Sequence, residues 1–156
     1  MRLTTFSDYA LRVLMYLGAN GGELATIGDI ASAYGISANH LMKVVHRLAQ
    51  GGYVETLRGK GGGMRLARRP EAIGLGALLR DTEEKRLVEC FDGASPGCRL
   101  EGSCVLRGVL SGALEAFFAV LDRYTLADLL GPRRKLAKLL VIAPPPAHGR
   151  ARRASP

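Results

Sequence analysis

Apolar residues recur at helical spacing through the first fifty positions of the chain. Their pattern predicts a first helix over residues 5–17, which is ended by the run Asn20-Gly21-Gly22. Thr26 stands three residues before an aspartate in the manner of an N-cap, so a second helix is expected over residues 27–34. Gly35 then allows a tight turn. The N-terminal part is therefore predicted to consist of short helices separated by turns.

A third helix is predicted from Ser37, its N-cap, to residue 50, and Gly51-Gly52 ends it. Two short helices joined by a turn that contains glycine form a helix-turn-helix, whose second helix enters the major groove of DNA. Alternating apolar and polar residues predict strands at 53–56 and 64–67, around a basic loop rich in glycine. A basic hairpin directly after a recognition helix is typical of the wing of a winged helix-turn-helix domain.

A broad apolar stripe from Val105 to Tyr124 predicts a long helix, and Thr125 begins a last short helix at residues 126–130. The stripe is wider than one small winged domain can cover. A partner helix from a second subunit is the economical cover, which predicts a two-fold homodimer. The expected fold is therefore mainly α with a small β-hairpin wing: a winged helix-turn-helix domain plus a long dimerisation helix.

The sequence divides into four predicted segments. They are a winged helix-turn-helix DNA-binding domain over 1–83, a cysteine-rich loop over 84–104, a dimerisation helix with a C-terminal short helix over 105–142, and a disordered basic tail over 143–156. No apolar run approaches the ~20 residues that cross a bilayer, and the N-terminus lacks a signal-peptide cleavage site. A cytoplasmic protein that does not contact membranes is expected, because reducing conditions would keep its cysteines unpaired.

The net charge of +8 is unevenly distributed along the chain. Residues 1–70 carry nine Lys and Arg against four Asp and Glu, whereas residues 71–130 carry six against ten. Residues 131–156 carry seven basic residues and no acidic one. Such asymmetry favours a polyanionic partner for the basic parts, and double-stranded DNA fits the helix-turn-helix.

The candidate DNA contacts lie on the recognition helix and at the tip of the wing. Asparagine can pair with adenine, lysine and arginine favour guanine or phosphate, and glycine allows the backbone to approach closely. The candidates are Ala38, Asn39, His40, Lys43 and Arg47 on the helix, and Arg58, Gly59 and Lys60 in the wing.

Enzymatic function is not expected. The glycine run at residues 59–63 lacks the GxxxxGK[ST] and GxGxxG patterns of nucleotide-binding loops, and no helix is predicted directly after it. No Ser-His-Asp, Cys-His or paired-carboxylate set stands out elsewhere in the chain.

All three cysteines, Cys90, Cys98 and Cys104, lie within fifteen residues of one another. The count is odd, so a closed set of disulfides is impossible and at least one thiol needs another role. Zinc is disfavoured because the gaps are irregular and no histidine lies between residues 47 and 147. An iron–sulfur cluster is the favoured interpretation, since a flexible loop can surround it. A thiol redox switch, which needs only two cysteines, stays open.

Together these motifs resemble the iron–sulfur winged-helix repressors, a family that includes NsrR, IscR and RirA. The resemblance covers residues 1–142 and rests on MRLTTFSDYALRVLMYL, on GISANHLMKVVHRLAQGGYVETLRGKGGG and on the three-cysteine loop. The segment LDRYTLADLL is most similar to the nitric-oxide-sensing branch.

The resemblance implies a transcriptional repressor whose binding to a pseudo-palindromic operator is controlled by the cluster, with nitric oxide as the favoured signal. One alternative is a regulator of the same family that reports iron or iron–sulfur status. A cluster-free redox-switch regulator and a dimeric scaffold that binds protein are the others.

The resemblance also suggests the cluster ligands. Cys90, Cys98 and Cys104 would be joined by Asp8 from the other subunit, and Arg12 would support the site. A [4Fe-4S] cluster is favoured over [2Fe-2S], although the long gap after the first cysteine departs from some relatives. The histidine ligand of IscR-like members is replaced here by Arg107. Asp8 has an alternative role, because Thr5 and Asp8 also fit a helix cap.

Overall fold

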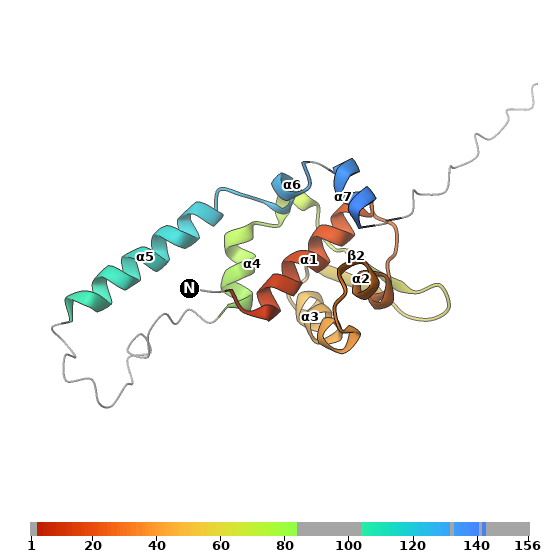
Figure 1. Ribbon diagram of the computed structural model, residues 1–156, viewed down its shortest axis with the longest axis horizontal. Coiled ribbons are helices and arrows are strands. Elements are labelled where there is room, and N and C mark those ends of the chain that lie inside the picture. The colour runs from red at the N-terminus through yellow and green to blue at the C-terminus, as the bar shows by residue number, and fades with distance from the viewer. Residues whose placement is uncertain (1–2, 84–103, 132, 141, 143–156) are drawn as a thin grey trace, which may run out of the picture.

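The structure, a computed structural model, describes residues 3–83, 104–131, 133–140 and 142 (Figure 1). The described part is mainly helical with one antiparallel hairpin, which confirms the predicted fold class. Its elements are α1 (Thr5–Ala19), α2 (Ile27–Tyr34), α3 (Ala38–Gln50), β1 (Val54–Leu57), β2 (Gly63–Leu66), the 3-10 turn η1 (Pro70–Ala72), α4 (Leu75–Thr82), α5 (Val105–Leu121), α6 (Leu126–Leu129) and α7 (Arg133–Leu139).

Helix α1 lies at the centre of the molecule and contacts α3, α4, α6, α7 and β2 (Figure 1). Its apolar residues Val13, Leu14 and Leu17 are almost completely buried. Burial of a leucine or valine side chain contributes roughly 1.5–3 kcal/mol, so α1 is the main organiser of the core.

The helix-turn-helix forms as the sequence predicts. Thr26 and Asp29 make a capping box at the start of α2, and Gly35 ends the helix with a φ of 64°, a conformation that glycine adopts readily. Helix α3 buries one face, formed by Leu41, Val44, Val45 and Leu48. The prediction for Ser37 was wrong in one respect: it stands at the N-cap position, but its side chain makes no capping hydrogen bond.

The wing is a two-stranded hairpin in which Val54 pairs with Leu66 and Leu57 with Gly63. Both strands are shifted by one residue from their predicted ranges. Met64 N donates a hydrogen bond of 2.8 Å to Ala25 O, and Ala25 N donates one of 3.0 Å to Met64 O. These two bonds attach the hairpin to the segment that precedes α2.

The long helix is shorter than predicted, because α5 ends at Leu121. The chain then turns at Asp122 and Arg123 and forms a short bridge, in which Leu75 N donates to Tyr124 O at 3.0 Å and Leu126 N donates to Ile73 O at 2.8 Å. Beyond it, α6 follows as predicted, and α7 is a helix that the sequence pattern did not predict. Leu126 and Leu130 belong to the same core cluster as α1.

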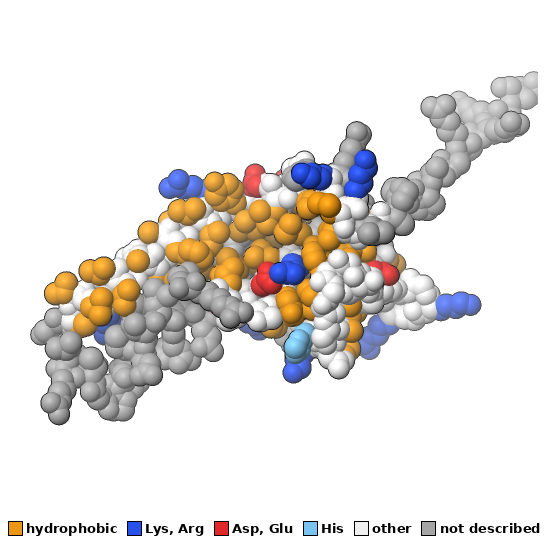
Figure 2. Space-filling view, viewed as in Figure 1, with side chains coloured by type: hydrophobic (Ala, Val, Ile, Leu, Met, Phe, Trp, Pro, Cys, Tyr) orange, Lys and Arg blue, Asp and Glu red, His pale blue; other side chains and the backbone are white. Residues whose placement is uncertain are grey.

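Helix α5 extends away from the body of the molecule and packs mainly against α4 (Figures 1 and 2). Among its residues only Phe118 is buried. Large apolar side chains are exposed along it, including Val105 at 79%, Leu106 at 61% and Val109 at 60%. An apolar face of this size on a helix favours coverage by another protein surface.

The pairing of α4 with α5 depends on a close approach at Gly76. Arg80 donates two hydrogen bonds of 2.6 Å to the Asp122 carboxylate, and its guanidinium lies 4.7 Å from the centre of the Phe118 ring. The Arg80 hydrogen bond lowers the pKa of Asp122. A Cβ atom on Gly76 would lie 2.8 Å from Asp122 Cγ, so a side chain there would have to displace the Asp122 carboxylate that Arg80 holds.

We therefore expect Gly76→Ala to lower the free energy of unfolding by about 1–3 kcal/mol, the usual cost of overpacking. Gly28→Ala is the matched control, because its new Cβ would meet only Thr26 Oγ1, at 3.5 Å. The control should be neutral or stabilising by up to about 1 kcal/mol through helix propensity. Thermal unfolding followed by circular dichroism measures both. Equal stability of the two variants would contradict the described contact.

Candidate DNA interface and metal ligands

The outer face of α3 is formed by polar residues opposite its buried stripe. All five residues predicted on this helix are exposed, and Asn39 and Lys43 lie directly opposite the core. Helical spacing adds His46 and Gln50 to the same line, and both are exposed. Gln50 was absent from the sequence-based set, although its position eleven residues after Asn39 could have indicated it.

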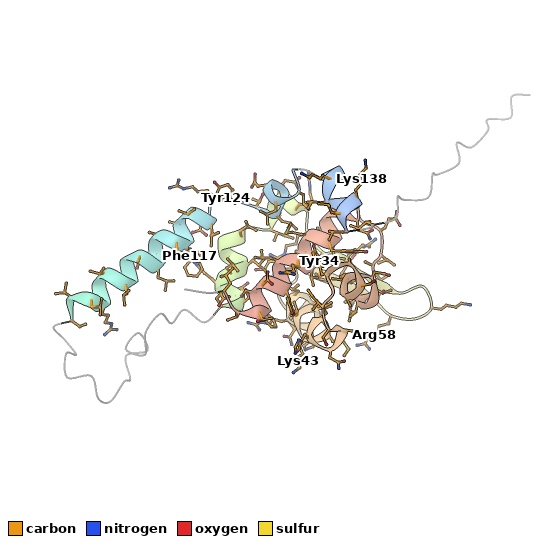
Figure 3. The ribbon with its side chains drawn as sticks, viewed as in Figure 1. Tyr34, Lys43, Arg58, Phe117, Tyr124 and Lys138 are labelled. Atoms are coloured by element: carbon orange, nitrogen blue, oxygen red, sulfur yellow. The ribbon has the colours of Figure 1, made fainter. Side chains whose placement is uncertain are left out.

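His40 occupies a different position from Lys43. Its ring lies 6.4 Å from the ring of Tyr9, so it sits on the flank of α3 nearest to α1. Figure 3 shows Lys43 and Arg58 on one side of the molecule, whereas Lys138 of α7 lies on the opposite side. The recognition helix and the wing therefore present one common face.

That face carries cations without internal partners. Within the described residues Lys43, Arg47, Arg58 and Lys60 form no ion pair, and the wing's Arg65 pairs with Glu55. Gly59 and Gly61 of the wing tip have φ values of 100° and 78°, a conformation that glycine adopts readily. Unpaired cations on one face are suited to a polyanion.

Asp8 lies in the first turn of α1, but it does not cap the helix. The capping interpretation is wrong, because Thr4 is the N-cap and its side chain accepts a hydrogen bond of 3.2 Å from Ser7 N. The Asp8 carboxylate instead accepts from Arg12 Nε at 3.1 Å and pairs with Arg12 Nη2 at 2.8 Å. Both side chains are about 40% exposed, at 44% for Asp8 and 40% for Arg12.

This ion pair leaves Asp8 accessible to another partner. Exposed pairs of this kind contribute only about 0.2–1 kcal/mol, so a metal could displace Arg12 at small cost. Arg12 also lies 6.0 Å from the Tyr9 ring and 5.7 Å from the Tyr34 ring. Burial raises the pKa of Tyr34, and the nearby Arg12 charge opposes that rise.

Of the three cysteines, only Cys104 belongs to the described residues. It immediately precedes α5, is partly exposed, and makes neither a disulfide nor a capping hydrogen bond within the described part of the chain. Cys90 and Cys98 lie outside the described residues. Thiolates are soft donors that suit an iron–sulfur cluster, whereas the Asp8 carboxylate is a hard donor. Arg107, one turn after Cys104, is exposed and supplies no metal ligand.

Residues 84–103, here called the cysteine segment, directly follow the last turn of α4, and hydrogen bonds join that turn to the start of α1. Thr4 donates from N and from Oγ1 to Glu83 Oε1, at 2.7 and 3.0 Å. The buried Ser7 hydroxyl donates to Thr82 Oγ1 at 2.8 Å. These bonds join residues more than seventy positions apart, so sequence spacing gave no signal for them. They hold the start of α1, which carries Asp8, against the last residue before segment 84–103.

The fold and the cationic face define the class of this protein: it is a winged helix-turn-helix DNA-binding transcriptional regulator. The sequence profile of the Rrf2 family, described as iron-dependent transcriptional regulators, matches residues 3–132. The chain belongs to the Rrf2 family. No helix in the described part of the chain is long and apolar enough to cross a membrane.

Relatives similar to this chain include the HTH-type transcriptional regulators NsrR of Bacillus subtilis and of Geobacillus kaustophilus. The first is 51% identical over 142 residues and the second 54%, each covering 90% of this chain and 97% of the relative. Both relatives are named as transcriptional regulators, a class of proteins that are not enzymes.

Solved structures with the same fold include IscR of T. potens, with a TM-score of 0.67 and 25% identity. That match covers 85% of this chain and 88% of IscR. CymR, the global cysteine regulator of B. subtilis, matches with a TM-score of 0.66 and 28% identity, over 83% of this chain and 95% of CymR.

Loss of a cation from α3 should weaken DNA binding more than loss of one from α7. We expect Lys43→Ala to reduce affinity by about tenfold and the salt dependence by about one counterion per subunit. Lys138→Ala is the matched control and should bind as the wild type does. Fluorescence anisotropy with a duplex selected by the wild-type protein measures both. A larger loss for Lys138→Ala would place the DNA face elsewhere.

Proposed function

We propose that this chain is a homodimeric transcriptional repressor whose operator binding is controlled by an iron–sulfur cluster, with nitric oxide as its signal. The observation that carries the proposal is Asp8, an accessible carboxylate that pairs, among the described residues, only with the half-exposed Arg12. It occurs in a chain about half identical to regulators named NsrR. The cytoplasm, where DNA and reduced thiols coexist, is the proposed location.

The proposed ligands are Cys90, Cys98 and Cys104 together with Asp8 of the partner subunit, and [4Fe-4S] is the proposed cluster. When bound, the cluster supplies iron that reacts with nitric oxide, which is the sensing chemistry. Asp8 is the only hard oxygen donor among soft thiolates, so it is the donor most easily released. Its release would let it pair with Arg12 again, as described above.

Arg12 then connects the ligand to the helix-turn-helix. Its guanidinium lies near Tyr9, which contacts His40 of α3, and near Tyr34, the last residue of α2. If Asp8 bound the cluster, its ion pair with Arg12 would break and the Arg12 side chain could move. The packing at the start of the recognition helix would therefore differ between the two states, and so would its approach to DNA.

The exposed apolar face of α5 supports the homodimer, since Val105, Leu106 and Val109 would otherwise face water. Two winged domains related by a two-fold axis would read the half-sites of a pseudo-palindromic operator, about one helical turn apart. The proposed contacts are Ala38, Asn39, His40, Lys43 and Arg47 with Arg58, Gly59 and Lys60, to which the outer line of α3 adds His46 and Gln50.

In functional terms we retain the four predicted segments. Residues 1–83 would bind DNA, residues 84–104 the cluster, and residues 105–142 the partner subunit, while 143–156 would form a basic tail. Helices α6 and α7, which belong to the third segment, also pack on α1. The third segment therefore supports the DNA-binding domain as well as the dimer.

A second candidate is a regulator of iron or cluster supply, which the description of the family as iron-dependent favours. In that case occupancy of the site, rather than nitric oxide, would be the signal. Removal of iron by a chelator would then release the protein from DNA without nitric oxide, and nitric oxide would have no specific effect on operator binding.

Native mass spectrometry of anaerobically purified protein, repeated after titration with nitric oxide, tests the proposal. We expect a dimer with one [4Fe-4S] cluster per subunit that converts to nitrosylated species. Asp8→Asn should hold less cluster and should lose the response of operator binding to nitric oxide. The control is Glu23→Gln, a carboxylate without an ion pair among the described residues.

Several outcomes would contradict the proposal. Unchanged cluster content and nitric oxide response in Asp8→Asn would remove Asp8 from the ligand set. A [2Fe-2S] mass would favour the iron-status candidate, and a zinc-bound or metal-free wild-type dimer would favour a structural site or a thiol switch.

A further inference from the structure

The last turn of α4 bonds to two separate parts of the DNA-binding domain. Thr82 and Glu83 bond to the start of α1, as described above. One residue earlier, Asp81 Oδ2 accepts a hydrogen bond of 2.6 Å from the hydroxyl of Tyr53. The cysteine segment begins directly after Glu83, so three consecutive residues before it hold three cross-links.

Tyr53 lies at the junction between the recognition helix and the wing. It stands between the end of α3 and the start of β1, and the residue is only 6% exposed. Tyr53 N donates to Leu48 O of α3 at 2.9 Å, and Ala67 N, just after β2, donates to Tyr53 O at 3.0 Å. A movement of Tyr53 therefore moves both DNA-contacting elements.

Arg68 strengthens this junction from the wing side. Its guanidinium lies 4.9 Å from the centre of the Tyr53 ring and donates a hydrogen bond of 2.7 Å to Gly51 O, at the end of α3. Gly51 has no room for a side chain, because a Cβ atom there would lie 2.8 Å from the Tyr53 ring. The tyrosine is thus held on three sides, and its hydroxyl reaches α4.

The hydroxyl spans an interface that is not closely packed. A cleft of about 160 Å³ separates the end of α3 from the last turn of α4 and is lined by Arg47, Gln50, Tyr53, Asp81 and Thr82, among others. A hydrogen bond to a carboxylate is among the stronger polar interactions of a protein. Burial first, and then Asp81, raise the pKa of Tyr53 to about 12, so the phenol remains a proton donor at neutral pH.

We infer that Asp81 and Tyr53 are positioning residues that transmit the state of the cysteine segment to the recognition helix and the wing. The inference rests on the proposed function and adds the contacts through which the cysteine segment would act on the DNA-binding elements. Because Asp81 lies within the same helical turn as Thr82 and Glu83, a shift of this turn relative to α1 would also displace the Tyr53 hydroxyl. The recognition helix and wing would follow, since both are bonded to Tyr53.

Tyr53→Phe tests the route, because it removes the hydroxyl and keeps the buried ring. Asp81→Ala removes the acceptor from an exposed position, and Tyr124→Phe is the control, because the Tyr124 side chain makes no hydrogen bond among the described residues. Operator affinity is measured for cluster-loaded and cluster-free protein at one salt concentration. Hydrogen exchange of the amides of residues 51–57 is measured in both forms.

In the wild type and the control, the two forms should differ in affinity by at least about fivefold, the lower end of typical coupling. In Tyr53→Phe and Asp81→Ala this ratio should fall toward one, and the difference in exchange at residues 51–57 should disappear. Cluster content should be unchanged, and the double variant should show no further loss. A merely structural role would weaken both forms equally and leave the ratio intact.

The inference is overturned if Tyr53→Phe, shown to be folded by thermal unfolding, keeps the wild-type ratio and exchange difference. If Asp81→Ala does not fold, Tyr53→Phe decides alone. A wild-type protein whose two forms bind the operator equally would overturn the proposed function together with this inference. Failure of this inference, in which the variants keep the wild-type affinity ratio, can therefore be distinguished from failure of the proposed function, in which the wild type itself shows no ratio.

Discussion

The burial of α1 is the constraint on which the rest of the molecule depends. Val13, Leu14 and Leu17 are almost fully enclosed, and the recognition helix, the wing, α4 and both C-terminal helices contact this one element. Interiors packed to this degree do not deform continuously, so a helix at their centre shifts as a unit. Asp8 lies in the first turn of that helix. A partner that binds Asp8 therefore acts on the element that positions all the others.

Polar contacts determine how the elements around α1 follow a shift of that helix. Helix α4 is bonded to α1 through Ser7 and Thr4, and to α5 through Arg80 and Asp122. The cysteine segment leaves from the end of α4 and returns at the start of α5, so both of its ends lie on helices joined by the Arg80 ion pair. Helix α5 itself buries little surface within one chain, and the proposed dimer would cover it. The DNA-binding face and the segment that we propose to bind the cluster thus share one small set of helices.

The sequence was sufficient to predict the helix-turn-helix and the wing, because local patterns determine them. Thr26, Gly35 and the alternating strands act within a few residues of the structure that they specify. The end of α5 and the existence of α7 were not predicted. The first depends on the bridge between Ile73–Leu75 and Tyr124–Leu126, and the second on packing of Leu136 and Leu140 against the core. In the candidate site, Asp8 was found through resemblance, whereas the contacts of Tyr53, Asp81, Thr82 and Glu83 join distant positions and carry no local signal.

The central claim is that the occupant of the cysteine segment controls the geometry of the DNA-binding face. Operator affinity of the wild-type dimer, measured anaerobically at one salt concentration with the cluster bound and after its removal, tests this claim most directly. The account predicts that the loaded form binds at least about fivefold more tightly, and that nitric oxide reduces its affinity to that of the cluster-free form. Equal affinity of the two forms would contradict the account.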